Sequence, residues 1–228
     1  MAECQWEYIA VTGHSFVHWL KEFVHKDVEL DTNLGLSSCK VSFFGKRGGR
    51  IRDIDNLMDS WCVPSGSTKA VVMMCGDNDV KKCSWYKESG HCASIVDEIM
   101  AEAVELKSRF DADAVIVCQL MPRFVDVCKP YKFDKRYNIK AGIINQSLKE
   151  KLCQMEGVFF WTHVTPKLKS FGIFPSNTIE FPKPDKYTWE DGIHMNNAGN
   201  FRLYTSLGRA LRLRHSQACD LIYHDTNI

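Results

Sequence analysis

The sequence predicts a three-layer α/β domain with a mostly parallel β-sheet. Apolar, strand-like runs alternate with amphipathic helical patterns along the chain, which is the order that βαβ units produce. Several runs are hydrophobic throughout instead of alternating, as expected for strands that are covered on both faces. The 228 residues, 45% of them hydrophobic, suffice for one substantial core. We therefore expect a single domain over residues 1–214, followed by a C-terminal tail over residues 215–228.

The predicted strands share a short length, apolar and β-branched or aromatic residues, and turn residues or charges at their ends. They span residues 6–12, 41–45, 70–75, 113–120 and 158–163.

Between the strands, apolar residues recur at the spacing of amphipathic helices. The predicted helices span residues 15–28, 50–60, 95–110, 139–152 and 203–211. In the fourth of these, we expect the apolar face to contain Ile139, Ile143, Ile144, Leu148 and Leu152. The segment 164–193 follows neither pattern and is rich in Pro, Lys and aromatic residues, which is typical of a functional loop.

Charge and cysteine usage exclude several classes of protein. With 29 basic and 28 acidic residues the net charge is +1, so the overall field is too weak to attract nucleic acid or an anionic membrane. No apolar run approaches the roughly 18 residues of a transmembrane helix, and the N-terminus lacks the basic start of a secretory signal. The ten cysteines contain no C-x-x-C pair and are expected to be reduced thiols of an intracellular, cytoplasmic protein.

A metal site is not expected. Cys83, His91 and Cys92 lie close together in the sequence, but no fourth ligand follows at the spacing of a zinc finger.

Polar residues follow each predicted strand, the last of them after the long loop. The motifs are G-H-S with Ser15, G-K-R-G-G-R with Gly49, G-D-N-D with Asn78, M-P-R with Arg123, and D-G-I-H with Asp191 and His194. Ligands of open α/β sheets bind at the carboxyl ends of the strands. We therefore expect one site at this edge of the sheet.

These residue types fit an acyl-transfer site, which needs a hydroxyl nucleophile, a base, a group that orients the base, and donors for an oxyanion. Ser15 supplies the hydroxyl, and we expect it also to cap the helix that follows. Asp191 and His194 are three residues apart, so the carboxylate can accept from one imidazole nitrogen and leave the other for Ser15. Gly49 offers an unobstructed N–H, and Asn78 offers a side-chain NH₂.

Alternatives stay open for two of these roles. His18, one helical turn after Ser15, and His163, at the end of the fifth strand, are rival bases without a carboxylate at a fixed spacing. Gly45 or Gly48 could replace Gly49 as the oxyanion donor.

Further residues are expected to border the cleft and contact the substrate. We assign this role to Arg123, His163, Tyr187 and Trp189. The aromatic rings could stack on a sugar or line an acyl pocket, and Arg123 could steady an anionic group or only pair with a carboxylate.

The ordered motifs resemble those of the SGNH hydrolases, also called the GDSL esterase/lipase superfamily, whose four blocks contribute a Ser, a Gly, an Asn and a His. The resemblance spans about residues 8–212. It implies a flavodoxin-like sheet of five parallel strands in the order 2-1-3-4-5. It also implies a serine esterase that hydrolyses small acyl esters without a metal or cofactor.

Carried over by the motifs, Ser15 would be the nucleophile, His194 the general base and Asp191 its orienter. The N–H groups of Ser15 and Gly49 and the side chain of Asn78 would form the oxyanion hole. The first block departs from the usual G-D-S of the family, because His14 replaces the Asp. This change affects either the bracing of the turn or the local charge beside Ser15.

Shorter phrases are similar to a narrower group, the esterase-like domains associated with metazoan non-LTR retrotransposons and their stand-alone relatives in invertebrates. The phrases are G-H-S-F-V, Q-L-M-P-R, the Y-N…I-N spacing at Tyr137, Asn138, Ile144 and Asn145, and D-G-I-H-M-N-N-A-G-N. This resemblance implies an acetyl-ester or lipid-ester substrate. The alternative function is a catalytically silent binding module of the same fold for a peptide, RNA or lipid. A flavodoxin-like phosphate-cofactor site is less consistent with the sequence, because no Thr/Ser-rich loop follows the first strand.

Overall fold

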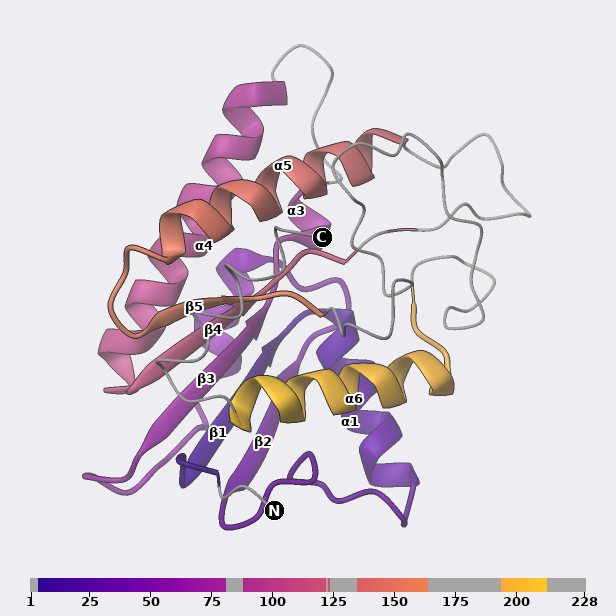
Figure 1. The fold of residues 1–228 in the computed structure, drawn as a ribbon, viewed down its shortest axis with the longest axis vertical. Coiled ribbons are helices and arrows are strands. Elements are labelled where there is room, and N and C mark those ends of the chain that lie inside the picture. The colour runs from indigo at the N-terminus through magenta and orange to yellow at the C-terminus, as the bar shows by residue number, and fades with distance from the viewer. Residues whose placement is uncertain (1–3, 81–87, 122, 124–134, 164–193, 213–228) are drawn as a thin grey trace, which may run out of the picture.

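A computed structural model describes residues 4–80, 88–121, 123, 135–163 and 194–212. Its strands form one five-stranded sheet in the order β2-β1-β3-β4-β5, and all neighbouring strands are parallel (Figure 1). The strands are Tyr8–Gly13 (β1), Lys40–Gly45 (β2), Lys69–Met74 (β3), Ala114–Cys118 (β4) and Val158–Trp161 (β5). The predicted fold class, strand order and strand positions are confirmed.

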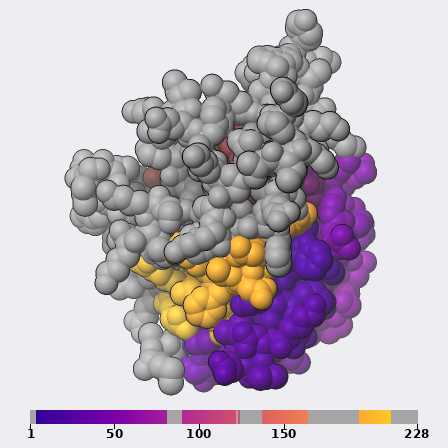
Figure 2. Space-filling model, turned by 90° about the vertical axis from the view of Figure 1, so that its right-hand side faces the viewer, coloured from indigo at the N-terminus to yellow at the C-terminus, as the bar shows by residue number. Residues whose placement is uncertain are grey.

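Helices cover both faces of the sheet, so the molecule has three layers. The helical elements are Ser15–Lys26 (α1), Ile51–Asp53 (η1), Ile54–Leu57 (α2), Asp77–Val80 (α3), Glu88–Arg109 (α4), Lys135–Leu152 (α5) and Asn197–Arg212 (α6). Side chains of α1 and α6 pack on one face, and those of α2, α4 and α5 pack on the other. In Figure 2, α6 (yellow) and α1 (indigo) lie beside each other on one side of the molecule.

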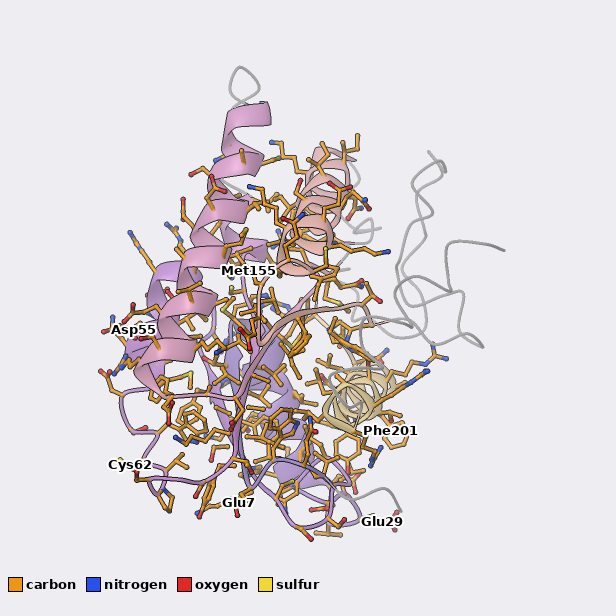
Figure 3. All side chains as sticks on the ribbon, turned by 60° about the vertical axis from the view of Figure 1, so that its left-hand side comes forward. Glu7, Glu29, Asp55, Cys62, Met155 and Phe201 are labelled. Atoms are coloured by element: carbon orange, nitrogen blue, oxygen red, sulfur yellow. The ribbon has the colours of Figure 1, made fainter. Side chains whose placement is uncertain are left out.

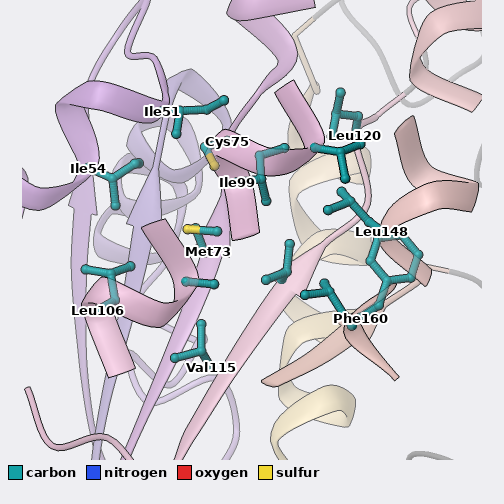
Figure 4. Close-up of a cluster of buried hydrophobic side chains, with 14 of the residues drawn as sticks. Ile51, Ile54, Met73, Cys75, Ile99, Leu106, Val115, Leu120, Leu148 and Phe160 are labelled. Carbon is teal, nitrogen blue, oxygen red and sulfur yellow. The ribbon is translucent and has the colours of Figure 1, made fainter. Parts of the chain in front are cut away.

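Both faces of the sheet are buried, which explains why the strands are hydrophobic throughout. In β3, Val71 and Met73 belong to the core under α4 and α5, which Figure 4 shows in close-up. Ala70, Val72 and Met74 belong to the core under α1 and α6. Because each fully buried aliphatic side chain contributes about 1.5–3 kcal/mol, this double burial is a large part of the stability.

The carboxyl ends of the strands lie opposite the end marked by Glu7 in Figure 3. Glu7 directly precedes β1, and Ser15 follows two residues after β1 ends. Since all strands are parallel, the loops that follow β2, β3, β4 and β5 emerge at the same edge as Ser15.

One predicted helix face is partly wrong. The buried side of α5 follows Ala141, Ile144 and Leu148, whereas Ile139 and Ile143 are 55% and 51% exposed. These two residues are out of phase with the three- and four-residue spacing of the buried side. The apolar face predicted from the isoleucines is therefore wider than the side of α5 that is buried.

Two short helical elements also differ from the prediction. The G-D-N-D motif, where no helix was predicted, forms the one-turn helix α3, in which the N–H groups of Asp79 and Val80 donate to the carbonyl of Gly76 at 3.0 and 3.1 Å. The helix predicted over residues 50–60 consists of η1 and α2 and ends at Leu57.

The described part of the chain contains no helix that is long and apolar enough to cross a membrane. The loop 164–193 and the tail 215–228 lie outside the described residues. The predicted domain bounds therefore stay a prediction.

We expect Gly45→Ala to destabilise the fold, because α1 crosses the end of β2 at this residue. A Cβ at position 45 would lie 2.2 Å from the backbone nitrogen of His18 and 2.6 Å from its Cα. The helix would have to shift, and we expect the free energy of unfolding to fall by about 3 kcal/mol in urea titrations.

Gly142→Ala is the matched control. Position 142 is in the interior of α5, and an added Cβ there would meet nothing within 4 Å. We expect this variant to gain up to about 1 kcal/mol from helix propensity. Equal unfolding midpoints for Gly45→Ala and the wild type would contradict the proposed close approach.

Candidate active site

His14, not Ser15, caps helix α1. The Nδ1 atom of His14 accepts the N–H of Phe16 at 3.4 Å, and the backbone of His14 is extended. Ser15 is therefore the first helical residue, and the expectation that it caps the helix is wrong. Because the imidazole reaches two residues along the chain, it performs the role that a Ser side chain often fills. The Ser15 hydroxyl has no hydrogen-bond partner among the described residues.

The other nitrogen of His14 binds a buried carboxylate. Nε2 of His14 lies 2.7 Å from Oδ2 of Asp77, and the two side chains are only 2% and 5% exposed. Since Nδ1 accepts a hydrogen bond, the proton lies on Nε2, which donates to Asp77. The hydrogen bond between His14 and Asp77 thus stabilises the turn before Ser15 at the position where the usual G-D-S motif has an Asp.

Asp77 also accepts hydrogen bonds from segments that follow β4. Its Oδ1 accepts the N–H of Met121 at 3.2 Å and the hydroxyl of Tyr137 at 2.6 Å. The guanidinium of Arg123 donates to the carbonyl of Asp77 at 2.9 Å and lies 4.1 Å from the centroid of the Tyr137 ring. Burial opposes ionisation, but His14, Arg123 and Tyr137 together lower the pKa of Asp77 below its ordinary value.

Two asparagines of α5 fix the segment that follows β4. Asn145 accepts the N–H of Leu120 at 2.7 Å and donates to its carbonyl at 3.0 Å. Asn138 makes the same pair of bonds to Arg123, at 2.9 and 2.8 Å. A seven-residue spacing places both amides on one side of the helix, so Met121 and Arg123 are held in place beside Asp77.

Asn78 and Asp79 hold the loop that follows β2. The Asn78 amide donates to the carbonyl of Gly49 at 2.8 Å, and Asp79 accepts the N–H of Ile51 at 3.2 Å. The second N–H of Asn78 has no acceptor in the described ranges of the chain. The N–H of Gly49 donates to the carbonyl of Lys46 at 3.0 Å, so it is engaged within its own turn.

His194 lies beside the first turn of α1. Its ring centroid is 6.5 Å from that of Phe16 and 6.4 Å from that of Trp19, in edge-to-face arrangements. Ser15 and His194 are thus at the same end of the same helix, although 179 positions apart in the sequence. No hydrogen bond joins them within the part of the chain that the structure describes, and apo geometry often leaves such a bond unformed.

Several other predicted site residues have different surroundings. Arg123 is buried, and its guanidinium binds the carbonyl of Asp77 and the ring of Tyr137. The ring of His18 packs edge-on against that of Trp19, with 5.1 Å between the ring centroids. Asp191, Tyr187 and Trp189 lie outside the described residues. The roles predicted for these residues therefore stay predictions.

No role was predicted for Asp77 or Tyr137, although both belong to motifs singled out in the sequence. The replacement of the usual Asp by His14 was a usable signal, since a buried imidazole needs an acceptor. The partner is 63 residues away, so only the sheet order brings the two together. No group of three or more His, Cys, Asp or Glu residues in the described part could hold a metal ion.

His163, also predicted to contact substrate, is buried at the end of β5. Its Nδ1 lies 3.0 Å from the hydroxyl of Ser206, while Nε2 has no partner among the described residues. Burial lowers the pKa of His163 to about 4, although the charge of Asp77 opposes this effect. His163 is therefore neutral at neutral pH, and its role in substrate binding stays a prediction.

The buried His163 makes stability depend on pH. Its folded-state pKa of about 4 lies below the roughly 6.5 of an unfolded histidine, so the unfolded chain takes up the proton first as the pH falls. The stabilisation that comes from keeping His163 neutral is complete above pH ~6.5. As the pH falls from about 6.5 to 4, the free energy of unfolding decreases by up to about 3 kcal/mol.

The matched variant is His163→Asn, whose amide can keep the bond to Ser206 but cannot titrate. We expect the free energy of unfolding to fall less between pH 7 and pH 4.5 in this variant than in the wild type. If the free energy of unfolding depends on pH in the same way in both proteins, His163 is not the titrating group.

Comparisons with known proteins agree with this architecture. No protein-family model matches the sequence, and no curated protein does. A Streptococcus pneumoniae protein provisionally named a platelet activating factor gives a TM-score of 0.61 at 17% identity, over 90% of this chain and 83% of its own. A member of the lipolytic G-D-S-L family from Veillonella parvula gives a TM-score of 0.56 at 13% identity and covers 91% of this chain and 100% of its own. An acetyl xylan esterase gives a TM-score of 0.57 at 16% identity and covers 89% of this chain and 98% of its own.

The chain shares their fold. At these identities the similarity establishes the three-layer architecture with its parallel sheet. The chemistry depends on the residues at the carboxyl edge of the sheet.

Proposed function

We propose that the protein is a serine esterase that hydrolyses small acyl esters through an acyl-enzyme. The observation that carries this proposal is the arrangement at the start of α1. Ser15 begins the helix with a hydroxyl that is not used as a cap, and His194 lies beside the same helical turn.

In this proposal, the hydroxyl of Ser15 attacks the carbonyl carbon of the ester while His194 takes its proton. His194 then gives the proton to the departing alcohol as the ester C–O bond breaks, which leaves the acyl group on Ser15. A water molecule that loses a proton to His194 attacks the acyl carbon, and the acid leaves as the bond to the Ser15 oxygen breaks and that oxygen regains the proton. Asp191, outside the described residues, would accept the other imidazole N–H and hold the ring in place.

The oxyanion of each tetrahedral intermediate needs donors that are already in position. The N–H of Ser15 suits this role, because it is in the first turn of a helix and has no acceptor in the described parts of the chain. The second N–H of Asn78 is a further donor. Gly49 would contribute only by sharing the N–H that now donates to Lys46.

We propose an acetyl or similarly short acyl group as the substrate's acid part. The rings of Phe16 and Trp19 lie within 6.5 Å of the ring of His194, so bulky side chains already surround the proposed base. The structural neighbour that is an acetyl xylan esterase supports the same choice. The resemblance to retrotransposon-associated domains, with its lipid-ester option, stays a prediction.

We expect Ser15→Ala to abolish ester hydrolysis, because Ser15 supplies the attacking oxygen in the proposed reaction. The variant should lose at least ~10³-fold in kcat/KM for p-nitrophenyl acetate. Ser60→Ala, which changes an exposed serine in the turn after α2, is the control and should match the wild type. Equal rates for Ser15→Ala and the wild type would end the proposal.

Covalent labelling separates an esterase from a silent binding module of the same fold. A fluorophosphonate phosphorylates only a serine whose hydroxyl is activated by an aligned base. We expect the wild type to be labelled at Ser15, as identified by mass spectrometry of the peptide, and Ser15→Ala to be unlabelled. A folded wild-type protein that resists the probe would favour the binding module.

A further inference from the structure

The buried pair of His14 and Asp77 connects two parts of the candidate site, Ser15 and Asn78, whose relative positions must stay fixed. We propose that His14 is a positioning residue of the esterase site, which fixes the Ser15 nucleophile and the Asn78 oxyanion donor relative to each other through its hydrogen bond to Asp77. This inference rests on the proposed function and deepens it. It assigns a role to the residue at which the chain departs from the G-D-S pattern.

His14 is held from both sides, so it can transmit position. Its Nδ1 accepts the N–H of Phe16, the residue after Ser15, and its Nε2 donates to Asp77 at 2.7 Å. Its own N–H donates to the carbonyl of Met74 at the end of β3 at 3.1 Å. The backbone on both sides of Ser15 is therefore anchored to β3 and to the residue that begins α3.

Asp77 transmits the same constraint to the oxyanion donor. It directly precedes Asn78, and its carboxylate accepts hydrogen bonds from three donors: His14, Met121 and Tyr137. Asn78 in turn donates to the carbonyl of Gly49. One carboxylate thus joins the loops that follow β1, β3 and β4, and its neighbour adds the loop that follows β2.

The Nε2–H of His14 and the carboxylate of Asp77 are a matched donor and acceptor. An Asp at position 14, as in the usual G-D-S pattern, would face Asp77 with a second carboxylate in a space where the present side chains are at most 5% exposed. Like charges in such a space disfavour each other. Restoring the common motif in this chain should therefore damage the site.

Two substitutions of His14 separate its two hydrogen bonds. Asn places its amide near the position of Nδ1, so His14→Asn can keep the cap on Phe16 but loses the bond to Asp77. Gln extends one bond further and places its amide near the position of Nε2, so His14→Gln can keep the bond to Asp77. A purely structural role in capping α1 would favour Asn, whereas the positioning role favours Gln.

The experiment measures kcat and KM for p-nitrophenyl acetate, with active sites counted by fluorophosphonate labelling. We expect kcat per labelled site to fall about 10–100-fold in His14→Asn and His14→Asp, with KM within about twofold of the wild type. In His14→Gln we expect kcat within about threefold of the wild type. Ile9→Val, at the opposite end of the buried strand β1, controls for lost stability and should keep kcat.

The inference is overturned if His14→Asn keeps the wild-type kcat, or if His14→Gln is as impaired as His14→Asn. If His14→Asn does not fold, Asp77→Asn decides, because an amide has one acceptor oxygen and cannot accept from His14 at the Oδ2 position while it also accepts from Met121 and Tyr137 at the Oδ1 position. A low kcat in Asp77→Asn supports the inference, and a wild-type kcat overturns it. A wild-type protein that neither hydrolyses the ester nor reacts with the probe refutes the proposed function itself, and the inference with it.

Discussion

The loops at the carboxyl edge of the sheet depend on the hydrogen bonds that the carboxylate of Asp77 accepts. A buried anion is tolerated only when hydrogen bonds and charges compensate for the lost water, and here the compensation comes from separate segments. His14 approaches from the start of α1, Met121 from the segment after β4, and Tyr137 from α5, while Arg123 supplies a nearby positive charge. Loops that would otherwise be independent are therefore arranged around one fixed point.

Most of the fold could be predicted from the sequence because each layer has a strong local signal. Strands buried on both faces need apolar residues at every position, and the run around Val71 and Val72 shows this directly. The failures occurred where the signal was short or too broad. The single turn of α3 is held by bonds to the carbonyl of Gly76, which no periodicity can reveal, and the exposed Ile139 and Ile143 show that apolar residues alone do not define a buried side.

The candidate site was predictable in part, because parallel strands deliver their loops to one edge whatever the details of packing. This rule is sufficient to bring Ser15 and His194 to the same helical turn. It gives no information on which polar groups are already used by the protein. The bond from the Gly49 N–H to Lys46 and the bond between His14 and Asp77 depend on loop conformation and on contacts between distant residues.

The capping arrangement at the start of α1 has a chemical consequence for the proposed nucleophile. A serine that caps a helix directs its oxygen back to the N–H groups of the first turn, and that hydrogen bond restricts its rotamer and occupies a lone pair. A nucleophile needs the same oxygen to point toward a base and a substrate. By placing His14 at the cap, the chain satisfies the helix with the preceding side chain and leaves Ser15 at a helical position with its hydroxyl unengaged by any described residue. Asp77 accepts the hydrogen bond on the far side of the imidazole and so leaves Nδ1 as the acceptor for the helix, which makes the buried pair and the unengaged hydroxyl two parts of one arrangement.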